Sequence, residues 1–208
     1  MVVATPKPLL ILISAPSGAG KTTLCEQLLA NHPEITRAVT CTTRAPRAGE
    51  RNGVDYHFLS RAEFEQRLQA GEFLEHANVY GNLYGTLKTE VLERLRTGKH
   101  VLLNIDVQGA ATVRQQAKSH AELGAALISV FLTPDSFSIL EQRLRKRGTD
   151  SEEVIQRRLL TARLELEQYR NFDYLLISTS IGEDLRRMQT ILEAERMRES
   201  RSIPPRFD

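Results

Sequence analysis

The sequence lacks the features that mark several broad classes of protein. Its two cysteines, Cys25 and Cys41, lie far apart and without metal-type spacing, which favours two reduced thiols over a disulfide. The net charge of +2 gives no electrostatic indication of nucleic-acid binding. The first apolar run, 9–13, is too short to cross a membrane, and no cleavage signal follows it. We therefore expect a cytoplasmic protein that binds neither nucleic acid nor a membrane.

The chain also lacks internal repeats, low-complexity tracts and paired histidines. None of its five histidines is therefore assigned to a metal or to catalysis: His32, His57, His76, His100 and His120. A length of 208 residues with 41% hydrophobic residues suits one domain with a full core. We expect a single domain over 1–208, acting as a monomer or a small homo-oligomer.

Short apolar runs alternate with helical patterns along most of the chain. Runs at 9–13, 101–105, 127–132 and 174–177 are typical of strands buried on both faces of a parallel sheet. Each is followed by a stretch with apolar residues at helical spacing, and a further helix is expected from Ile155 to Tyr169. This order predicts an α/β fold, with a mostly parallel sheet and helices on both faces. The last residues, 200–208, read as a frayed polar tail.

Residues from about 36 to 86 break this alternation. They contain short runs separated by turn pairs, including Asn52-Gly53. Gly81-Asn82 lies between two short apolar pairs, as the turn of a two-residue hairpin would. We expect a small antiparallel insertion here. A second break, the highly charged, glycine-containing stretch from Arg147 to Glu153, separates two helices.

A glycine-rich turn after the first predicted strand carries the strongest single motif. Gly20-Lys21-Thr22 completes G-x-x-x-x-G-K-[ST], although Ala15 stands where the motif has its first glycine. Backbone N–H groups and a helix N-terminus at such a turn bind phosphate. Lys21 is expected to reach the β- and γ-phosphates of a nucleoside triphosphate, and the Thr22 hydroxyl to join the shell of Mg²⁺. The expected phosphate-binding residues are Ala15, Pro16, Ser17, Gly18, Ala19, Gly20, Lys21, Thr22 and Thr23.

Three further motifs carry a family resemblance. They are T-T-R-x-P-R at 42–47, G-x-x-Y-G at 81–85 and D-x-Q-G at 106–109. Together with the phosphate-binding loop they resemble the guanylate kinase family, from about residue 9 to about residue 198. The resemblance implies a P-loop nucleoside-monophosphate-kinase fold. It also implies transfer of the γ-phosphoryl group of ATP to GMP and dGMP, with Mg²⁺ as cofactor.

The resemblance also implies an acceptor site. Arg44 and Arg47, with Tyr56 and Tyr84, match residues that hold the phosphate of GMP, which suits guanidinium and phenol donors on a dianion. Glu75 matches the glutamate that accepts from N1–H and the exocyclic amine of guanine, a contact that adenine cannot supply. The other expected base-lining residues are Thr40, Thr86 and Asp106.

The charged stretch 147–158 resembles the lid of that family. Arg147 and Arg158 match arginines that close over the transferring phosphoryl group, and Arg143 matches one near ATP. Arginines in a closing segment stabilise the charge of the transition state and exclude water. The expected catalytic residues are Lys21, Arg44, Arg147 and Arg158. The core is expected at about 8–35, 87–146 and 159–199, the GMP-binding insertion at about 36–86, and a mobile lid at about 147–158.

Two positions depart from the family pattern, and two other functions stay open. Asn104 stands where the family usually has aspartate, so we expect weaker magnesium binding. Ser178 stands where many relatives have asparagine near the adenine, which weakens a prediction of strict preference for ATP. The alternatives are a non-catalytic guanylate-kinase-like binding module and a ribosyl bisphosphate phosphokinase. The intact Gly20-Lys21-Thr22 argues against the first, and Glu75 with the two tyrosines argues against the second.

Overall fold

Five parallel strands form the centre of the structure, a computed structural model that describes residues 7–79, 81–146 and 151–202. The strands lie in the order β2 (Ile35–Arg37), β7 (His100–Asn104), β1 (Leu10–Ser14), β8 (Leu127–Pro134) and β9 (Tyr174–Ser178). Four of them confirm the strands expected from the apolar runs. The fifth, β2, was not predicted, because only one of its three residues is buried and its sequence shows no apolar run.

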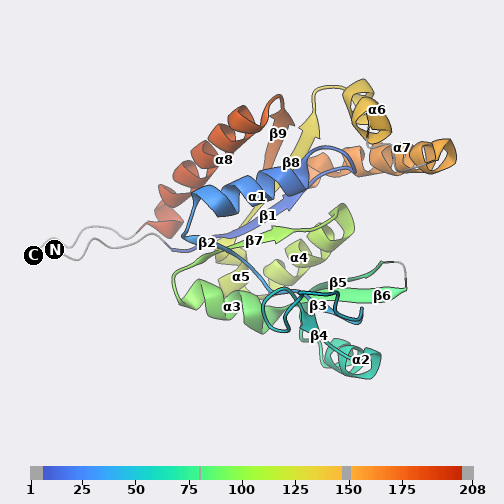
Figure 1. Ribbon diagram of the computed structural model, residues 1–208. Helices are drawn as coiled ribbons and strands as arrows, with labels where there is room; N and C mark the ends of the chain where they lie inside the picture. The colour runs from blue at the N-terminus through green and yellow to red at the C-terminus, as the bar shows by residue number, and fades with distance from the viewer. Residues whose placement is uncertain (1–6, 80, 147–150, 203–208) are drawn as a thin grey trace, which may run out of the picture.

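Helices cover both faces of this sheet (Figure 1). On one face α1 (Lys21–Asn31) and α8 (Ile181–Arg196) pack with the buried side chains of Ile11 and Ile13. On the other, α3 (Lys88–Arg96), α4 (Val107–Ser119) and α5 (Ala121–Ala126) pack with Leu10 and Leu12. Successive strand residues face opposite sides of a sheet, so burial of both faces explains why β1 is apolar throughout.

A second, smaller sheet occupies the insertion. Its order is β4 (His57–Phe58), β3 (Cys41–Thr42), β6 (Asn82–Leu87) and β5 (Phe73–Val79), and α2 (Arg61–Gln69) precedes β5. The pairs β3–β6 and β5–β6 are antiparallel as expected, whereas β3 and β4 are parallel. The expected turn at Gly81-Asn82 was wrong by one residue, because Asn82 already pairs with Val79 in the ladder.

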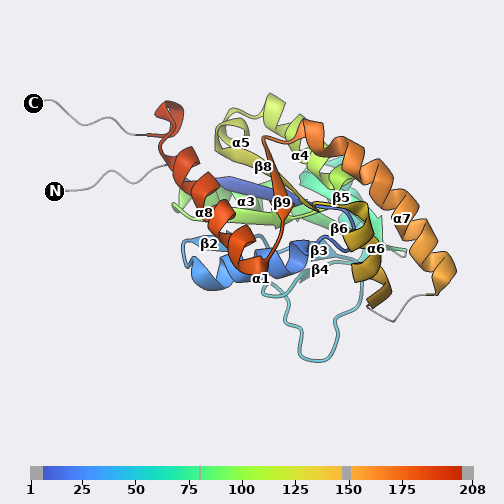
Figure 2. The same cartoon turned by 90° about the horizontal axis from the view of Figure 1, so that it is seen from above.

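Two helices, α6 (Phe137–Lys146) and α7 (Glu152–Glu167), lie at the end of the main sheet opposite to the C-terminal end of α8 (Figures 1 and 2). Buried Leu140 and Leu144 of α6 pack with Ile155 and Leu159 of α7. Residues 147–150 between these helices lie outside the described part of the chain. Among the described helices, none has the length and apolar character needed to cross a membrane.

The expected frayed tail was wrong for its first residues. Glu199–Arg201 forms a short 3₁₀ helix, η2, and Arg201 is buried. The Arg201 guanidinium pairs with buried Glu195, and it donates to the carbonyls of Ala125 and Leu127 at 3.1 and 3.0 Å. A buried ion pair of this kind fastens the end of α8 to the start of β8. Its partners are distant in sequence, so local polarity did not indicate it.

A buried histidine at the opposite end of the strands from the phosphate-binding loop predicts acid sensitivity. His100 Nδ1 accepts from the Leu9 backbone N–H at 2.8 Å, and its Nε2 lies 3.1 Å from Arg196. Burial and the Arg196 charge lower the pKa of His100 to about 4, despite nearby Glu34. Because the unfolded chain binds the proton near pH 6.5, stability is complete above that pH and is lost as pH falls towards 4. We expect a loss of about 1–2 kcal/mol between pH 7.5 and pH 5.

Urea denaturation of the parent and of His100→Gln at the two pH values measures this loss. The exposed His76→Gln serves as the control, since it removes a histidine without removing the buried interaction. His100→Gln should flatten the pH dependence, and His76→Gln should retain it. Equal pH dependence in all three proteins would contradict the assignment to His100.

Candidate active site

The phosphate-binding loop connects the C-terminal end of β1 to α1. Gly18 and Gly20 have positive φ values of 90° and 100°. A Cβ on Gly18 would lie 3.2 Å from the Leu144 side chain, so α6 closes tightly over the loop. Gly20 caps α1 without any side chain, which leaves the first N–H groups of the helix directed at the loop. The residues of the loop line a cavity of about 300 Å³: Ala15, Pro16, Ser17, Gly18, Ala19, Gly20, Lys21, Thr22 and Thr23, with Asp106 and Glu165.

Lys21 is held inside this cavity. Its Nζ donates at 2.6 Å to the carbonyl of Ile105, the residue that follows the end of β7. Burial lowers the pKa of Lys21, while the nearby carboxylates of Asp106 and Glu165 act to raise it. The Ile105 contact keeps the ammonium group beside the loop, at the position from which it can reach a phosphate.

The Arg143 side chain, which was predicted to lie near ATP, contacts the backbone of the loop. Its Nη1 donates to the carbonyl of Ala19 at 3.0 Å. Together with Leu144 against Gly18, this bond fastens α6 to the phosphate-binding loop. Ser178 has a partner inside the protein, because its Oγ donates to buried Asp184 at 2.6 Å.

A second cavity, of about 330 Å³, lies between the two sheets. Six of the predicted acceptor residues line it: Thr40, Tyr56, Glu75, Tyr84, Thr86 and Asp106. They come from β5, β6 and the segments after β2, before β4 and after β7. The fold therefore brings together residues separated by as much as 66 positions, from Thr40 to Asp106.

Glu75 is the chemical centre of the second cavity. It is 6% exposed, and its Oε1 accepts from the Thr86 hydroxyl at 2.7 Å, so the opposing strand fixes its orientation. Burial and the Asp106 charge raise the pKa of Glu75, whereas the bond from Thr86 lowers it. A Cβ on Gly109, at the start of α4, would lie 3.4 Å from Glu75 Oε2, so a helix N-terminus approaches the same carboxylate.

Both arginines that were predicted to bind the acceptor phosphate contact Glu50. Arg44 Nη2 donates to both carboxylate oxygens of Glu50, at 2.8 and 3.0 Å, and its guanidinium lies over the Tyr56 ring at 5.4 Å. Arg47 is exposed and contacts Glu50 through its backbone: its N–H donates to the carboxylate at 2.7 Å, and its carbonyl accepts from the Glu50 N–H at 3.1 Å. Neither arginine lines the second cavity in the described part of the chain. Glu50 is thus the acidic partner of the Arg44 guanidinium.

Asp106 joins the two cavities, since it lines both. It is also the N-cap of α4, where its Oδ1 accepts from the N–H groups of Gln108 and Gly109 at 3.0 and 2.8 Å. The capping role fixes the carboxylate at the boundary between the loop and the second cavity. A group transferred from one cavity to the other would pass beside it.

Sequence reasoning missed Arg37, which also lines the second cavity. Its Nη2 donates to the carbonyl of Asp55 at 3.2 Å. Arg37 is the last residue of β2, at the carboxyl end of a parallel strand, where α/β proteins bind ligands. That signal would have been visible had β2 been predicted.

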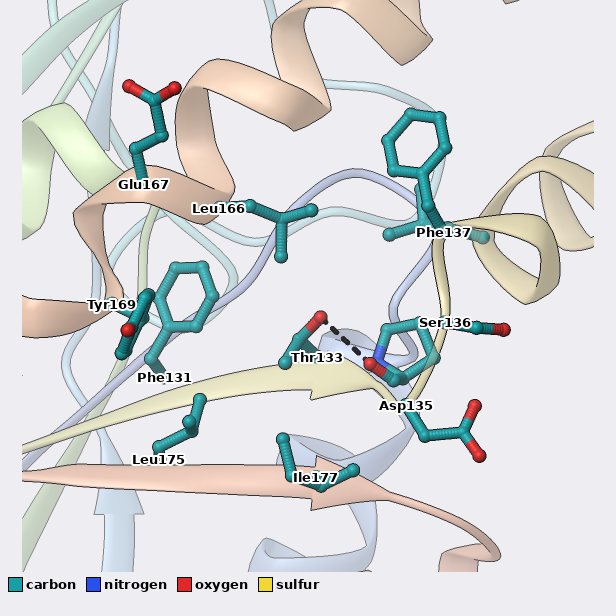
Figure 3. Close-up of a pocket in the computed structure, with 12 residues that line it drawn as sticks. Phe131, Thr133, Asp135, Ser136, Phe137, Leu166, Glu167, Tyr169, Leu175 and Ile177 are labelled. Carbon is teal, nitrogen blue, oxygen red and sulfur yellow. Dashed lines mark hydrogen bonds between the residues drawn. The ribbon is translucent and has the colours of Figure 1, made fainter.

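The predicted lid residues are only partly described. Arg147 lies outside the described residues. Arg158 is half-buried on α7, seven residues before Glu165 and therefore on the same side of the helix. A separate apolar groove of about 380 Å³, between the end of α7 and strands β8 and β9, contains none of the predicted site residues (Figure 3).

The donor set near the loop suits a hard divalent cation. Thr22, Asn104 and Asp106 carry hydroxyl, amide and carboxylate oxygens, the type of ligand that Mg²⁺ prefers. No group of three or more His, Cys, Asp or Glu side chains that could hold a metal occurs within the residues that the structure describes.

The fold and these two cavities define a P-loop phosphotransferase with a nucleotide-sized acceptor site. The family profile described as Guanylate kinase matches residues 7–195. The chain belongs to the guanylate kinase family.

Individual relatives agree with the family match. A guanylate kinase of Idiomarina loihiensis is 49% identical over 191 residues, which cover 91% of this chain and 88% of the relative. One of Neisseria meningitidis is 45% identical over 93% of this chain and 91% of its own. The crystal structure of guanylate kinase from Anaplasma phagocytophilum matches with a TM-score of 0.70 and 30% identity, covering 96% of this chain and 92% of that one.

Proposed function

We propose that this chain transfers the γ-phosphoryl group of ATP to GMP, giving ADP and GDP, and that dGMP is a second acceptor. The observation that carries the proposal is the buried carboxylate of Glu75, in a cavity that meets the phosphate-binding loop at Asp106. Membership of the guanylate kinase family supports the same reaction. The chain would act as a monomer or small homo-oligomer in the cytoplasm.

Selection of guanine follows from the hydrogen-bonding capacity of Glu75. An ionised carboxylate only accepts, and the edge of guanine offers N1–H and an amine as two adjacent donors. Adenine presents an unprotonated N1 to the same carboxylate and leaves it unpaired. Thr86 holds Glu75 from the side, and Asp106 would accept from the guanine amine.

Capture of the GMP phosphate would require Arg44 to exchange partners. The phosphate would replace Glu50 as the acceptor of Arg44 Nη2, with Tyr56 and Tyr84 donating from their hydroxyls. Arg47, which is exposed, would turn inward to the same anion. Ion pairing with Glu50 holds Arg44 beside the Tyr56 ring.

Phosphoryl transfer would then depend on position and charge. Lys21 would leave the Ile105 carbonyl for the β- and γ-phosphates, and the loop N–H groups would hold the β-phosphate. Thr22 would hold Mg²⁺ together with water, and the cation would supply charge neutralisation between the two phosphates. Because the acceptor phosphate is already anionic, no general base is needed.

The division of the chain follows from these roles. We assign the core to about 8–35, 87–146 and 159–199, the GMP-binding insertion to about 36–86 and the lid to about 147–158. Arg147 and Arg158 would close over the transferring group, and Arg143 would hold the loop on the ATP side. Exclusion of water by closure would prevent hydrolysis of ATP.

Asn104→Asp is expected to tighten magnesium binding while leaving the reaction intact. Asn104 is exposed at the end of β7, two residues before Asp106, and an aspartate there adds one negative charge near the cation. We expect the magnesium concentration for half-maximal activity to fall by about two- to fivefold, the scale of a partly screened charge interaction. Magnesium titration at fixed ATP and GMP measures this. An unchanged half-saturation would show that position 104 is outside the influence of the cation.

A panel of acceptors tests the proposal against its alternatives. Coupled detection of ADP with GMP, dGMP, AMP, UMP and ribosyl phosphates should show turnover with the guanine nucleotides. Turnover with a sugar phosphate alone would indicate a ribosyl bisphosphate phosphokinase. Absence of turnover with every acceptor would indicate a non-catalytic binding module.

A further inference from the structure

Glu165 reaches the phosphate-binding loop from a distant part of the chain. It lies in the last turn of α7 and lines the same cavity as Ser17, Lys21 and Thr22. One of its oxygens, Oε2, is buried and makes no hydrogen bond to any described residue. An unpaired buried carboxylate oxygen is costly, so its position beside an anion-binding loop calls for a physical reason.

The groups around Glu165 act on its pKa in opposite directions. Burial raises the pKa of Glu165 and the Asp106 charge raises it further, whereas the Ser17 backbone and the Lys21 charge lower it. Lys21 donates to the carbonyl of Ile105, so that hydrogen bond does not go to Glu165. The carboxylate therefore lies in the cavity of a loop whose N–H groups are of the kind that bind a phosphate.

Both helices that flank 147–150 reach the loop. From α6, Arg143 bonds to Ala19 and Leu144 packs on Gly18. From α7, Glu165 lines the loop cavity together with Ser17, and Arg158 lies two turns away on the same side of the helix. A change at the loop can thus be transmitted to α7 through Glu165.

We propose that Glu165 is a positioning residue that acts as an internal substitute for the donor phosphate. Its carboxylate lies in the loop cavity and is displaced by the phosphates of the triphosphate, which moves the end of α7 and couples donor binding to that helix. This inference rests on the proposed binding of ATP at the loop. It predicts that the carboxylate and the phosphates compete through their charges.

Isothermal titration with magnesium-free ADP at low ionic strength tests the competition. Glu165→Gln keeps the shape of the side chain and removes its charge, and we expect it to bind ADP about five- to tenfold more tightly than the parent. Glu165→Asp, which restores the charge, should return affinity towards that of the parent. Glu167→Gln is the matched control, because Glu167 is exposed on the same helix and its carboxylate is directed away from the other side chains of the apolar groove (Figure 3).

Amide hydrogen exchange across α7, with and without ADP, provides the second readout. ADP should alter exchange in the last turns of α7 in the parent and in Glu167→Gln, and much less in Glu165→Gln. Weaker or unchanged ADP binding by Glu165→Gln, with normal binding by the parent, would overturn the role of Glu165 but not the donor site. A parent that does not bind ADP would overturn the donor site and this inference together. An exchange response in Glu165→Gln equal to that of the parent would overturn the coupling.

Discussion

Lys21→Ala should reduce the turnover of GMP by a factor of about a thousand or more, the largest effect expected of any single substitution here. We propose that Lys21 contacts the β- and γ-phosphates, and its ammonium group is held in the loop cavity by the carbonyl of Ile105. Solvent replaces a charge lost from a preorganised site poorly. Steady-state kinetics with ATP and GMP measure the loss, mainly in kcat, because the charge on the transferring group matters most in the transition state.

The matched control is Lys118→Ala, an exposed lysine in the last turn of α4. It removes the same charge and side chain from the surface, and we expect nearly parental kinetics. Thermal denaturation of both variants separates a loss of chemistry from a loss of fold. Turnover by Lys21→Ala within about tenfold of the parent would contradict the role of Lys21, since a charged phosphate contact has a larger effect than that.

Glu75→Gln should lower kcat/KM for GMP by about a hundredfold or more, and it should narrow the preference for GMP over AMP. The amide keeps an oxygen that can accept from Thr86, so the strands should stay paired. Its NH₂ group, however, would face one of the two guanine donors. Two facing donors cannot bond to each other, so the amide N–H and that guanine N–H would both be unsatisfied in a buried site. The kcat/KM for AMP should fall little or even rise, because the amide N–H can donate to N1 of adenine.

Glu72→Gln controls for this substitution. Glu72 is exposed next to the start of β5 and pairs with Arg67 at 3.2 Å, so its replacement removes a carboxylate near the site without touching the base cavity. Parental GMP kinetics are expected. An unaltered ratio of GMP to AMP turnover in Glu75→Gln would show that another group selects the base.

The sequence predicted those parts of the fold that are set by local pattern. The apolar run of β1 indicates a strand buried on both faces, and Gly18 and Gly20 indicate a tight turn before a helix, because both signals arise within a few residues. Strand β2 and the Arg201–Glu195 pair depend instead on distant partners. No periodicity in a three-residue strand or in a charged tail can indicate them.

The candidate site shows the same division. The family motifs predicted residues that line the second cavity, and the structure brings Tyr56, Glu75, Tyr84 and Thr86 together around it. The motifs did not predict that Arg44 is paired with Glu50, because a motif match does not identify the partner of a side chain within the protein. Glu165 was missed because it is one of several acidic residues on an amphipathic helix, and only its packing against the loop distinguishes it.

The acceptor panel is the measurement that tests the central assignment most directly. With ATP and Mg²⁺ supplied, we expect ADP release with GMP and dGMP, and at least about a hundredfold lower kcat/KM with AMP and UMP, because only guanine satisfies Glu75. Equal rates with AMP and GMP, or turnover with a ribosyl phosphate and not with GMP, would contradict the account.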